Sequence, residues 1–187
     1  TGEFYRQWIE TKFFDAHLKG GAADGLPEAY VFETGANRWQ MFEAWPPAEV
    51  KKERFHLAAG GKLAKKAPAE KGDAFDEFPS DPARPVPFSE SIAVGMTREY
   101  MTDDQRFAAR RPDVLVYQTD PLPRDLTLCG PVLAELFVST SQSDADWVVK
   151  LIDVFPPDEE AQRRTSRGRP LGGYQMMVRS EVIRGRF

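Results

Sequence analysis

The sequence predicts a mainly β protein, with two packed antiparallel sheets, one helix at the N-terminus and one long irregular loop. Three observations carry this prediction. Residues 147–155 form the most apolar nine-residue stretch of the chain, and they are short, rich in β-branched side chains and closed by Pro156-Pro157, which favours a strand over a buried helix. From Asp113 onward the chain is a succession of similar short runs separated by turn residues. A clear helical repeat is found near the N-terminus.

The predicted helix covers residues 3–19. Its apolar face repeats at i, i+3, i+4, i+7 and i+8, positions occupied by Tyr5, Trp8, Ile9, Lys12 and Phe13. Lys19 followed by Gly20-Gly21 marks its end. A face this aromatic needs a neighbour to cover it, so we expect the chain to begin inside a larger fold, with residues 22–27 as a linker.

A β-hairpin is predicted next, from residues 29–35 and 38–45, because both runs alternate and are separated by a turn rich in glycine and asparagine. The indoles of Trp39 and Trp45 flank this hairpin, and a buried indole N–H needs a hydrogen-bond partner. A third strand is predicted in residues 55–58, before a Gly-Gly turn.

Residues 62–91 are predicted to form the long irregular loop, because they carry several prolines and charges and little periodicity. Ordered loops of this length commonly serve a function or cover a neighbouring element. Residues 100–107 follow as a short helical turn that we expect Thr102 to cap, and Arg111-Pro112 ends it.

The late strands are predicted at residues 114–119, 125–129, 131–140, 147–155 and 174–186. Side chains in residues 126–137 alternate between two faces, as they do in the strands of a sandwich. We predict that residues 147–155 are a central strand covered on both faces. Its buried side chains would be Trp147, Val149, Leu151 and Phe155 on one face, and Val148, Ile152 and Val154 on the other. Lys150 and Asp153 interrupt these faces and are expected to be solvated or paired, and residues 158–169 form a charged insert.

Asp144 and Asp146 precede the central strand in a small, polar segment that starts at Ser139. One interpretation is a tight turn in which a carboxylate accepts from backbone N–H groups. The other is a functional carboxylate pair, either in a calcium loop or, with Asp153 as a further candidate, in acid/base catalysis. A calcium loop would need further oxygen ligands and a glycine, and this segment has neither.

Composition excludes several classes of function. The 187 residues carry a formal charge of −4 with no basic stripe, so nucleic acid and anionic membranes are not expected as partners. Cys129 is the only cysteine and there are two histidines, His17 and His56, so neither a disulfide framework nor a metal site is expected, and no cofactor is predicted. The chain has no run of 18 apolar residues and no secretory leader, which predicts a soluble protein, cytoplasmic as it stands, or periplasmic or secreted if a leader has been removed.

Seven segments in order resemble a known family: residues 32–39, 44–47, 57–63, 104–107, 111–117, 139–156 and 172–186. Together they are similar to the C-terminal part of the α-amino-acid ester hydrolases, a group related to cocaine esterase, glutaryl cephalosporin acylases and X-prolyl dipeptidyl peptidases. The resemblance implies an α/β-hydrolase domain with a helical cap, followed by a jelly-roll-like, galactose-binding-like β-sandwich. It also implies acyl transfer by a serine, with a histidine as base and an aspartate orienting it.

None of these catalytic residues can be assigned here. The serine elbow of the form Gly-x-Ser-x-Gly does not occur in the sequence. The resemblance places the triad upstream of the helix in residues 3–19, so His17 is not the catalytic histidine. Residues 1–27 would then be the terminal helix and linker of the hydrolase domain, and residues 28–187 a β-sandwich without its last strands.

The leading hypothesis is the C-terminal β-sandwich portion of a serine hydrolase that acts on ester or amide acyl bonds, inert on its own. Such a domain would form a wall of the acyl pocket, and its candidate residues are Trp39, Tyr100, Asp144, Asp146 and Trp147. Its partners would be the hydrolase and cap domains and further copies of itself. The alternative is a free-standing jelly-roll module that binds carbohydrate through Trp39, Trp45 and Trp147, unless these indoles are buried anchors.

Overall fold

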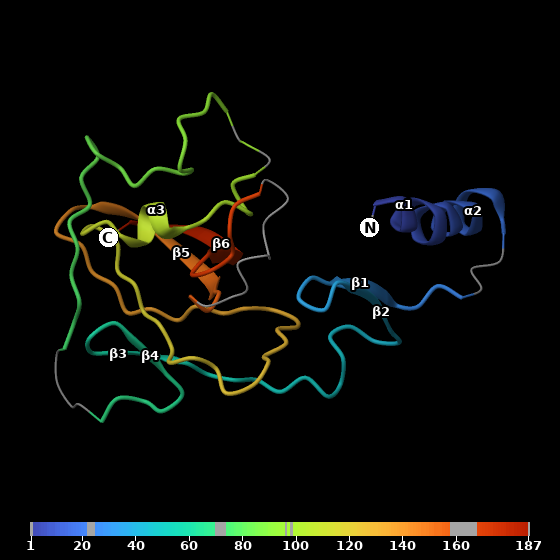
Figure 1. The fold of residues 1–187 in the computed structure, drawn as a ribbon, viewed down its shortest axis with the longest axis horizontal. Coiled ribbons are helices and arrows are strands. Elements are labelled where there is room, and N and C mark those ends of the chain that lie inside the picture. Colours follow the sequence, from blue (N-terminus) through green and yellow to red (C-terminus); the bar gives the residue numbers. More distant parts are fainter. Residues whose placement is uncertain are drawn as a thin grey trace. The chain divides into compact units, whose positions relative to one another are not determined.

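The computed structural model describes residues 2–21, 25–69, 74–95, 97, 99–157 and 168–186. Its strands form three antiparallel two-stranded sheets, so the protein is mainly β, as predicted (Figure 1). Its N-terminal segment is helical, and one short helix lies in the second half of the chain. The chain divides into two units, residues 1–53 with 126–132, and residues 54–125 with 133–187.

In the first unit the N-terminal helix consists of α1 (Gly2–Phe4), the π-helical η1 (Tyr5–Glu10) and α2 (Thr11–Lys19). The predicted helix is therefore confirmed, including its end, because Gly20 adopts the left-handed conformation with φ 69° that glycine tolerates. The π-helical stretch was not predicted. Thr11 contributes to it, since both its backbone N–H and its hydroxyl donate to the carbonyl oxygen of Arg6, five residues earlier.

The predicted hairpin is confirmed as β1 (Ala29–Glu33) and β2 (Arg38–Phe42), with Phe32 opposite Trp39. Asn37 closes the turn at φ 54°, in the left-handed region that asparagine tolerates. The start of the helix packs on this hairpin, because the Phe4 ring lies 5.4 Å from Trp39 and 5.9 Å from Tyr30 between centroids. The helix thus has a neighbour within its own unit, although Trp8, Phe13 and Phe14 stay largely exposed.

In the second unit β3 (His56–Ala58) and β4 (Lys62–Ala64) form a tight hairpin. Strand β4 was not predicted, and the irregular loop therefore begins after Ala64 rather than at Lys62. The segment around Gln118 lies beside β4, since Leu63 N–H donates to Gln118 O and Gln118 N–H donates to Gly61 O at 2.9 and 2.8 Å. Gly61 is required there, because a Cβ on it would lie 2.8 Å from the carbonyl oxygen of Val116.

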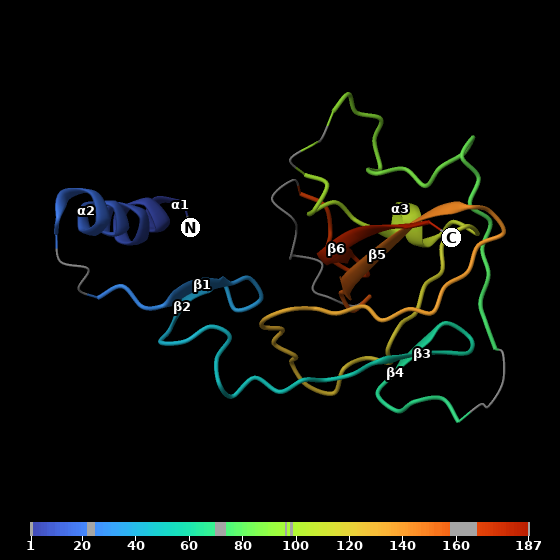
Figure 2. The same ribbon diagram turned by 180° about the vertical axis from the view of Figure 1, so that it is seen from behind.

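The long ribbon of this unit pairs β5 (Asp144–Val154) with β6 (Gln175–Arg186), and both predicted strands are confirmed (Figure 2). A bulge interrupts the pairing between Leu151 and Ile152. The prediction that β5 is covered on both faces is wrong in the described structure. Val148 and its partner Val182 are each 57% exposed, because β6 is the strand that pairs with β5 and no second sheet covers this face of the ribbon in the described part of the chain.

The other three late strands are not found. Residues 114–119, 125–129 and 131–140 form no strand ladder, apart from a single parallel bridge between Gln118 and Lys62. Alternation of side chains indicates two faces, but a strand also needs a neighbour for its backbone N–H and C=O groups, and these segments have almost none. The jelly-roll arrangement therefore stays a prediction.

A small buried core joins the short helix α3 (Arg106–Ala109) to the start of β6. Its buried residues are Asp104, Gln105, Ala108, Leu171, Tyr174 and Met177. The helix lies later in the chain than the predicted turn in residues 100–107, and Thr102 does not cap it. The Thr102 hydroxyl donates to the carbonyl oxygen of Glu99, and the Asp104 carboxylate accepts from the first helical N–H, that of Arg106. Most of the predicted charged insert lies outside the described residues. No described helix is long and apolar enough to cross a membrane.

Candidate functional site

The segment before α3 is fixed to β6 by a set of hydrogen bonds between residues that are far apart in the sequence. Gln105 N–H donates to the carbonyl oxygen of Gln175 at 3.0 Å, and Gln175 N–H donates back to the Asp104 carboxylate at 3.3 Å. The Tyr174 hydroxyl donates to the carbonyl oxygen of Thr102 at 2.5 Å. Three residues before α3, Thr102, Asp104 and Gln105, are therefore hydrogen-bonded to two consecutive residues at the start of β6 or just before it.

Gln105 is the centre of this network, with 1% of its surface exposed. Its amide nitrogen donates to the carbonyl oxygens of Asp103 and Tyr100, at 2.9 and 3.4 Å. Its amide oxygen accepts from the ammonium of Lys150 on β5 at 2.8 Å. The Lys150 ammonium also lies 5.6 Å from the centroid of the Phe107 ring, so a half-buried cation is held by one dipole and one aromatic face.

Burial lowers the pKa of Lys150 below its usual value, because the charged ammonium is partly removed from water. The pKa of the Asp104 carboxyl is set by two opposing effects. Burial alone raises its pKa, but hydrogen bonds from the Arg106 side chain and from the backbone N–H groups of Arg106 and Gln175 together lower it below the usual range. Asp104 is thus a buried carboxylate held charged by donors, and Arg106 Nε lies 2.7 Å from it.

Two of the predicted site residues, Tyr100 and Trp147, hold the long irregular loop. The Phe88 ring of that loop lies 4.7 Å from the Tyr100 ring, and the Phe78 ring lies edge-on to Trp147 at 6.0 Å. The indole N–H of Trp147 is buried and has no hydrogen-bond partner among the residues that the structure describes. Both side chains are half-buried, so each packs as an anchor on one side.

A further hydrogen bond holds the same loop. The Tyr117 hydroxyl donates to the carboxylate of Asp76 at 2.5 Å. Burial, followed by this hydrogen bond and the negative charge of Asp76, raises the pKa of Tyr117 to about 12. The loop is therefore attached to the rest of its unit at three aromatic positions.

Asp144 and Asp146 lie in β5 rather than in a turn, which corrects the first interpretation of this segment. Asp146 is held by Arg184 through two hydrogen bonds of 2.7 and 3.1 Å, and Asp144 lies 3.3 Å from Arg186. These arginines are the cross-strand partners of the two aspartates in the β5–β6 register. The tight turn before β5 is instead stabilised by Thr140, whose hydroxyl accepts from Gln142 N–H at 3.2 Å.

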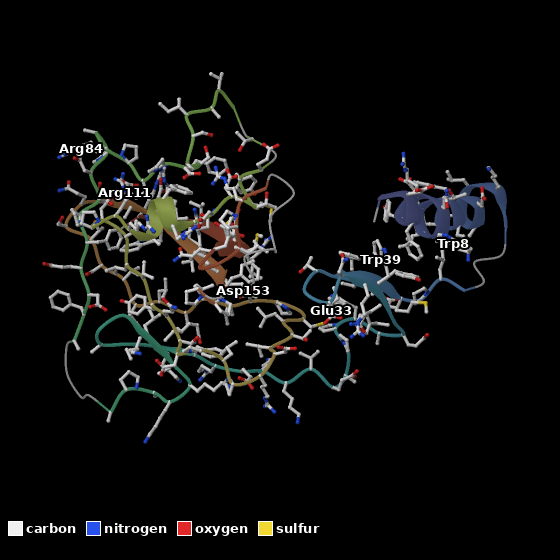
Figure 3. The ribbon with its side chains drawn as sticks, in the orientation of Figure 1. Trp8, Glu33, Trp39, Arg84, Arg111 and Asp153 are labelled. Carbon is white, nitrogen blue, oxygen red and sulfur yellow. The ribbon has the colours of Figure 1, made fainter. Side chains whose placement is uncertain are left out.

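Trp39, the fifth candidate, belongs to the first unit, where Phe4, Tyr30 and Phe32 surround it at centroid distances of 5.3 to 5.6 Å. Figure 3 labels Trp39 on the β-hairpin of that unit and Asp153 on the long ribbon of the second. Trp39 and Trp147 thus both pack against aromatic neighbours, which is the arrangement of structural anchors. Trp45 is 43% exposed beside Phe42.

The titratable side chains of the described residues are spread over several elements. No group of three His, Cys, Asp or Glu side chains there is arranged to hold a metal ion. The two histidines lie on different elements, His17 on α2 and His56 on β3. Sequence reasoning missed Gln105 as the centre of the network; its only signal was a position between two charged residues in a predicted helical turn.

These observations define a β-rich domain whose buried polar groups fasten its own elements together, and whose sequence contains no serine elbow. The chain belongs to the family described as the X-Pro dipeptidyl-peptidase C-terminal non-catalytic domain, whose model matches residues 21–184. It is the C-terminal domain of hydrolases of the esterase and peptidase type, as the resemblance in sequence implied.

Two relatives show how much of a longer protein such a chain represents. The chain is 34% identical over 155 residues to the cocaine esterase of Rhodococcus sp. (strain MB1 Bresler), a match that covers 77% of this chain and 27% of the esterase. It is also similar to the crystal structure of an aminopeptidase from a marine sediment archaeon, Thaumarchaeota archaeon, with 41% identity and a TM-score of 0.84. That match covers 99% of this chain and 30% of the aminopeptidase, so the chain spans less than a third of both relatives.

Proposed function

We propose that this chain is the C-terminal β-sandwich portion of a serine hydrolase that cleaves ester or amide acyl bonds, and that it has no hydrolytic activity of its own. The observation that carries the proposal is the match to a non-catalytic domain family over residues 21–184, in a sequence without a Gly-x-Ser-x-Gly elbow. The names of the two relatives, an esterase and an aminopeptidase, suggest the ester and amide bonds.

The division of the chain follows from the same proposal. Residues 1–27 would be the terminal helix and linker of the hydrolase domain, and residues 28–187 the β-sandwich. Two features support it: the family match begins at residue 21, after the helix, and the helix leaves Trp8, Phe13 and Phe14 largely exposed. An aromatic face of this kind is what a neighbouring domain would cover.

The proposed contribution of this domain to catalysis is a wall of the acyl pocket. Tyr100 and Trp147 are its strongest candidates, because both are aromatic, half-buried and packed on the long loop, so the loop and the wall would move together. Asp144 and Asp146 are weaker candidates, since arginines already occupy their carboxylates. Trp39 is enclosed by an aromatic cluster in the other unit.

The proposed partners are the hydrolase and cap domains and a second copy of the chain. Support comes from the large amount of apolar surface in the second unit. Leu133 and Phe137 are 81% and 108% exposed, and they lie in a segment without ladder partners. Monomeric proteins rarely leave so much apolar surface in water, so we propose that part of it is an interface.

Assay of the purified chain on a small activated ester tests the absence of activity. We expect no turnover above the buffer rate, and turnover that a serine-directed inhibitor abolishes would overturn the proposal. The pocket wall is tested in the full-length enzyme with Tyr100→Ala and Trp147→Ala, measured as kcat/KM over esters with short and long acyl groups. A change that depends on acyl length supports the wall. The matched control is Phe75→Ala, an exposed aromatic on the same loop.

A further inference from the structure

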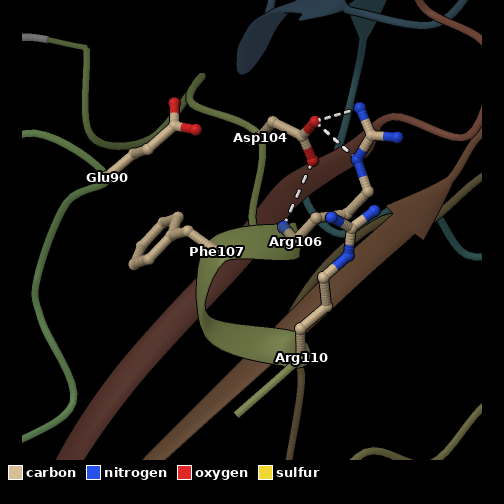
Figure 4. Close-up of a pocket in the computed structure, with 5 residues that line it drawn as sticks. All are labelled: Glu90, Asp104, Arg106, Phe107 and Arg110. Atoms are coloured by element: carbon tan, nitrogen blue, oxygen red, sulfur yellow. Dashed lines mark hydrogen bonds and ion pairs between the residues drawn. The ribbon is translucent and has the colours of Figure 1, made fainter.

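A pocket of about 300 Å³ opens beside α3 and is lined by Glu90, Asp104, Arg106, Phe107 and Arg110. None of these is a residue proposed for the acyl-pocket wall. Its volume is at the lower end of the range of about 300–1,000 Å³ that small-molecule sites occupy. Two arginines, two carboxylates and one aromatic ring give it a chemical character that the proposed function does not use. Figure 4 shows these five side chains.

Three of the four charges in this pocket already have partners. Arg106 is held by Asp104, with Nε 2.7 Å from the carboxylate. The Glu90 carboxylate lies 2.7 Å from Arg169. Arg110 is the exception, because its guanidinium has no side-chain partner among the residues that the structure describes. The pocket therefore keeps one uncompensated positive charge.

The helix places that charge beside a second cation. Arg106 and Arg110 are separated by one helical turn, and Arg110 N–H donates to the carbonyl oxygen of Arg106 at 3.3 Å. In Figure 4 the Arg110 side chain runs up along the helix toward Arg106. Like charges at this spacing disfavour the helix, and Asp104 offsets only one of them. A bound anion at Arg110 would relieve the repulsion.

Phe107 gives this otherwise charged pocket one aromatic surface. The Phe107 ring extends on the side of Glu90 (Figure 4), and the Lys150 ammonium over its face holds it in place. A guanidinium presents a planar fork that matches a carboxylate in two hydrogen bonds, whereas the ring offers a surface for hydrocarbon. We propose that this pocket binds a small organic acid, with its carboxylate on Arg110 and its apolar part against Phe107. This site is independent of the proposed acyl chemistry.

Titration of the purified chain with benzoate, followed by calorimetry and by NMR, tests the proposal. Benzyl alcohol serves as the neutral probe of the same shape and inorganic phosphate as the anion without an apolar part. We expect saturable benzoate binding, at least tenfold weaker binding of both other probes, and at least tenfold loss in Arg110→Gln. The matched control is Arg179→Gln, an exposed arginine on β6, which should leave binding unchanged.

Each other outcome contradicts the proposal in a defined way. Equal binding of phosphate and benzoate would show a general anion site, and equal binding of benzyl alcohol would show an apolar site without charge recognition. Benzoate binding that survives Arg110→Gln, or no benzoate binding to a folded chain, would remove the site altogether. Circular dichroism of each variant establishes that it is folded, and Arg110 is exposed, so its substitution leaves the core in place.

Discussion

The ammonium of Lys150 donates to the side-chain oxygen of Gln105 at 2.8 Å, across 45 residues of sequence. This bond joins the middle of β5 to the segment before α3, and Gln105 carries it on to the carbonyl oxygens of Asp103 and Tyr100. A single amide thus satisfies one cation and two backbone acceptors in the most buried part of the second unit. The domain depends on this polar contact as well as on its apolar core.

Gln105→Leu should therefore destabilise the domain, because it removes the hydrogen bonds that the Gln105 side chain makes to the half-buried Lys150 and to two carbonyl oxygens. The expected loss is about 1–3 kcal/mol in the free energy of unfolding, measured by urea denaturation. In Gln105→Leu with Lys150→Met the loss should be smaller than the sum of the single losses, since both partners of the bond are then apolar. Gln142→Leu, at an exposed turn, is the control. Additive losses would show that the bond contributes nothing.

Asp104 should make stability depend on acid pH. Its pKa is lowered in the folded protein, so the folded state binds the proton more weakly than the unfolded state does. The stability that it contributes is present above the ordinary carboxyl pKa of 3.8 and is lost as the pH falls through the lower folded value. The difference in unfolding free energy between the native chain and Asp104→Asn should shrink from about pH 5 to about pH 3. A difference that is constant with pH would contradict this.

Tyr117 should ionise well above the usual pH range of a tyrosine. Its pKa is raised to about 12 by burial and by Asp76, so its contribution to stability is fully present below pH 10.0 and is lost as the pH rises through about 12. An alkaline titration followed by phenolate absorbance should lose the absorbance change near pH 12 in Tyr117→Phe. A Tyr117→Phe variant that keeps the absorbance change near pH 12 would contradict the assignment.

Local patterns in the sequence predicted the elements whose partners are near in the chain. The helix ending at Lys19 and the hairpin of β1 and β2 follow from spacing and turn residues, and β5 follows from its apolar run. What the sequence could not supply is which distant segment lies beside which. The sequence therefore suggested that Asp146 is a turn residue, although it lies on a strand and pairs with Arg184. It likewise suggested that Gln105 is an ordinary helical residue, although its partners come from β5 and β6.

The burial of individual side chains also depends on distant neighbours, and the structure changes the expectation for Leu151. The sequence predicted that Leu151 is buried, with a cost of about 2–5 kcal/mol for Leu151→Ala. Leu151 is half-buried beside the bulge of the ribbon, whereas Met177 on β6 is 5% exposed. Met177→Ala should therefore cost about 2–5 kcal/mol, and Leu151→Ala clearly less, in urea denaturation of both variants. A larger loss for Leu151→Ala would mean that its face is covered in solution.

The uncovered face of the ribbon gives the last prediction. Val148 and Val182 lie opposite each other on β5 and β6, and each is 57% exposed. A two-stranded ribbon also leaves two outer edges whose backbone groups can pair with another chain. The chain should therefore associate with itself at micromolar concentration, measured by sedimentation velocity. Val182→Lys should weaken this association about tenfold or more, because it puts a charge at the centre of the apolar pair, while Arg179→Gln on the same strand should leave it unchanged. A native chain that sediments as a 21.1 kDa monomer, or a Val182→Lys variant that associates as the native chain does, would show that this face is not an interface between copies.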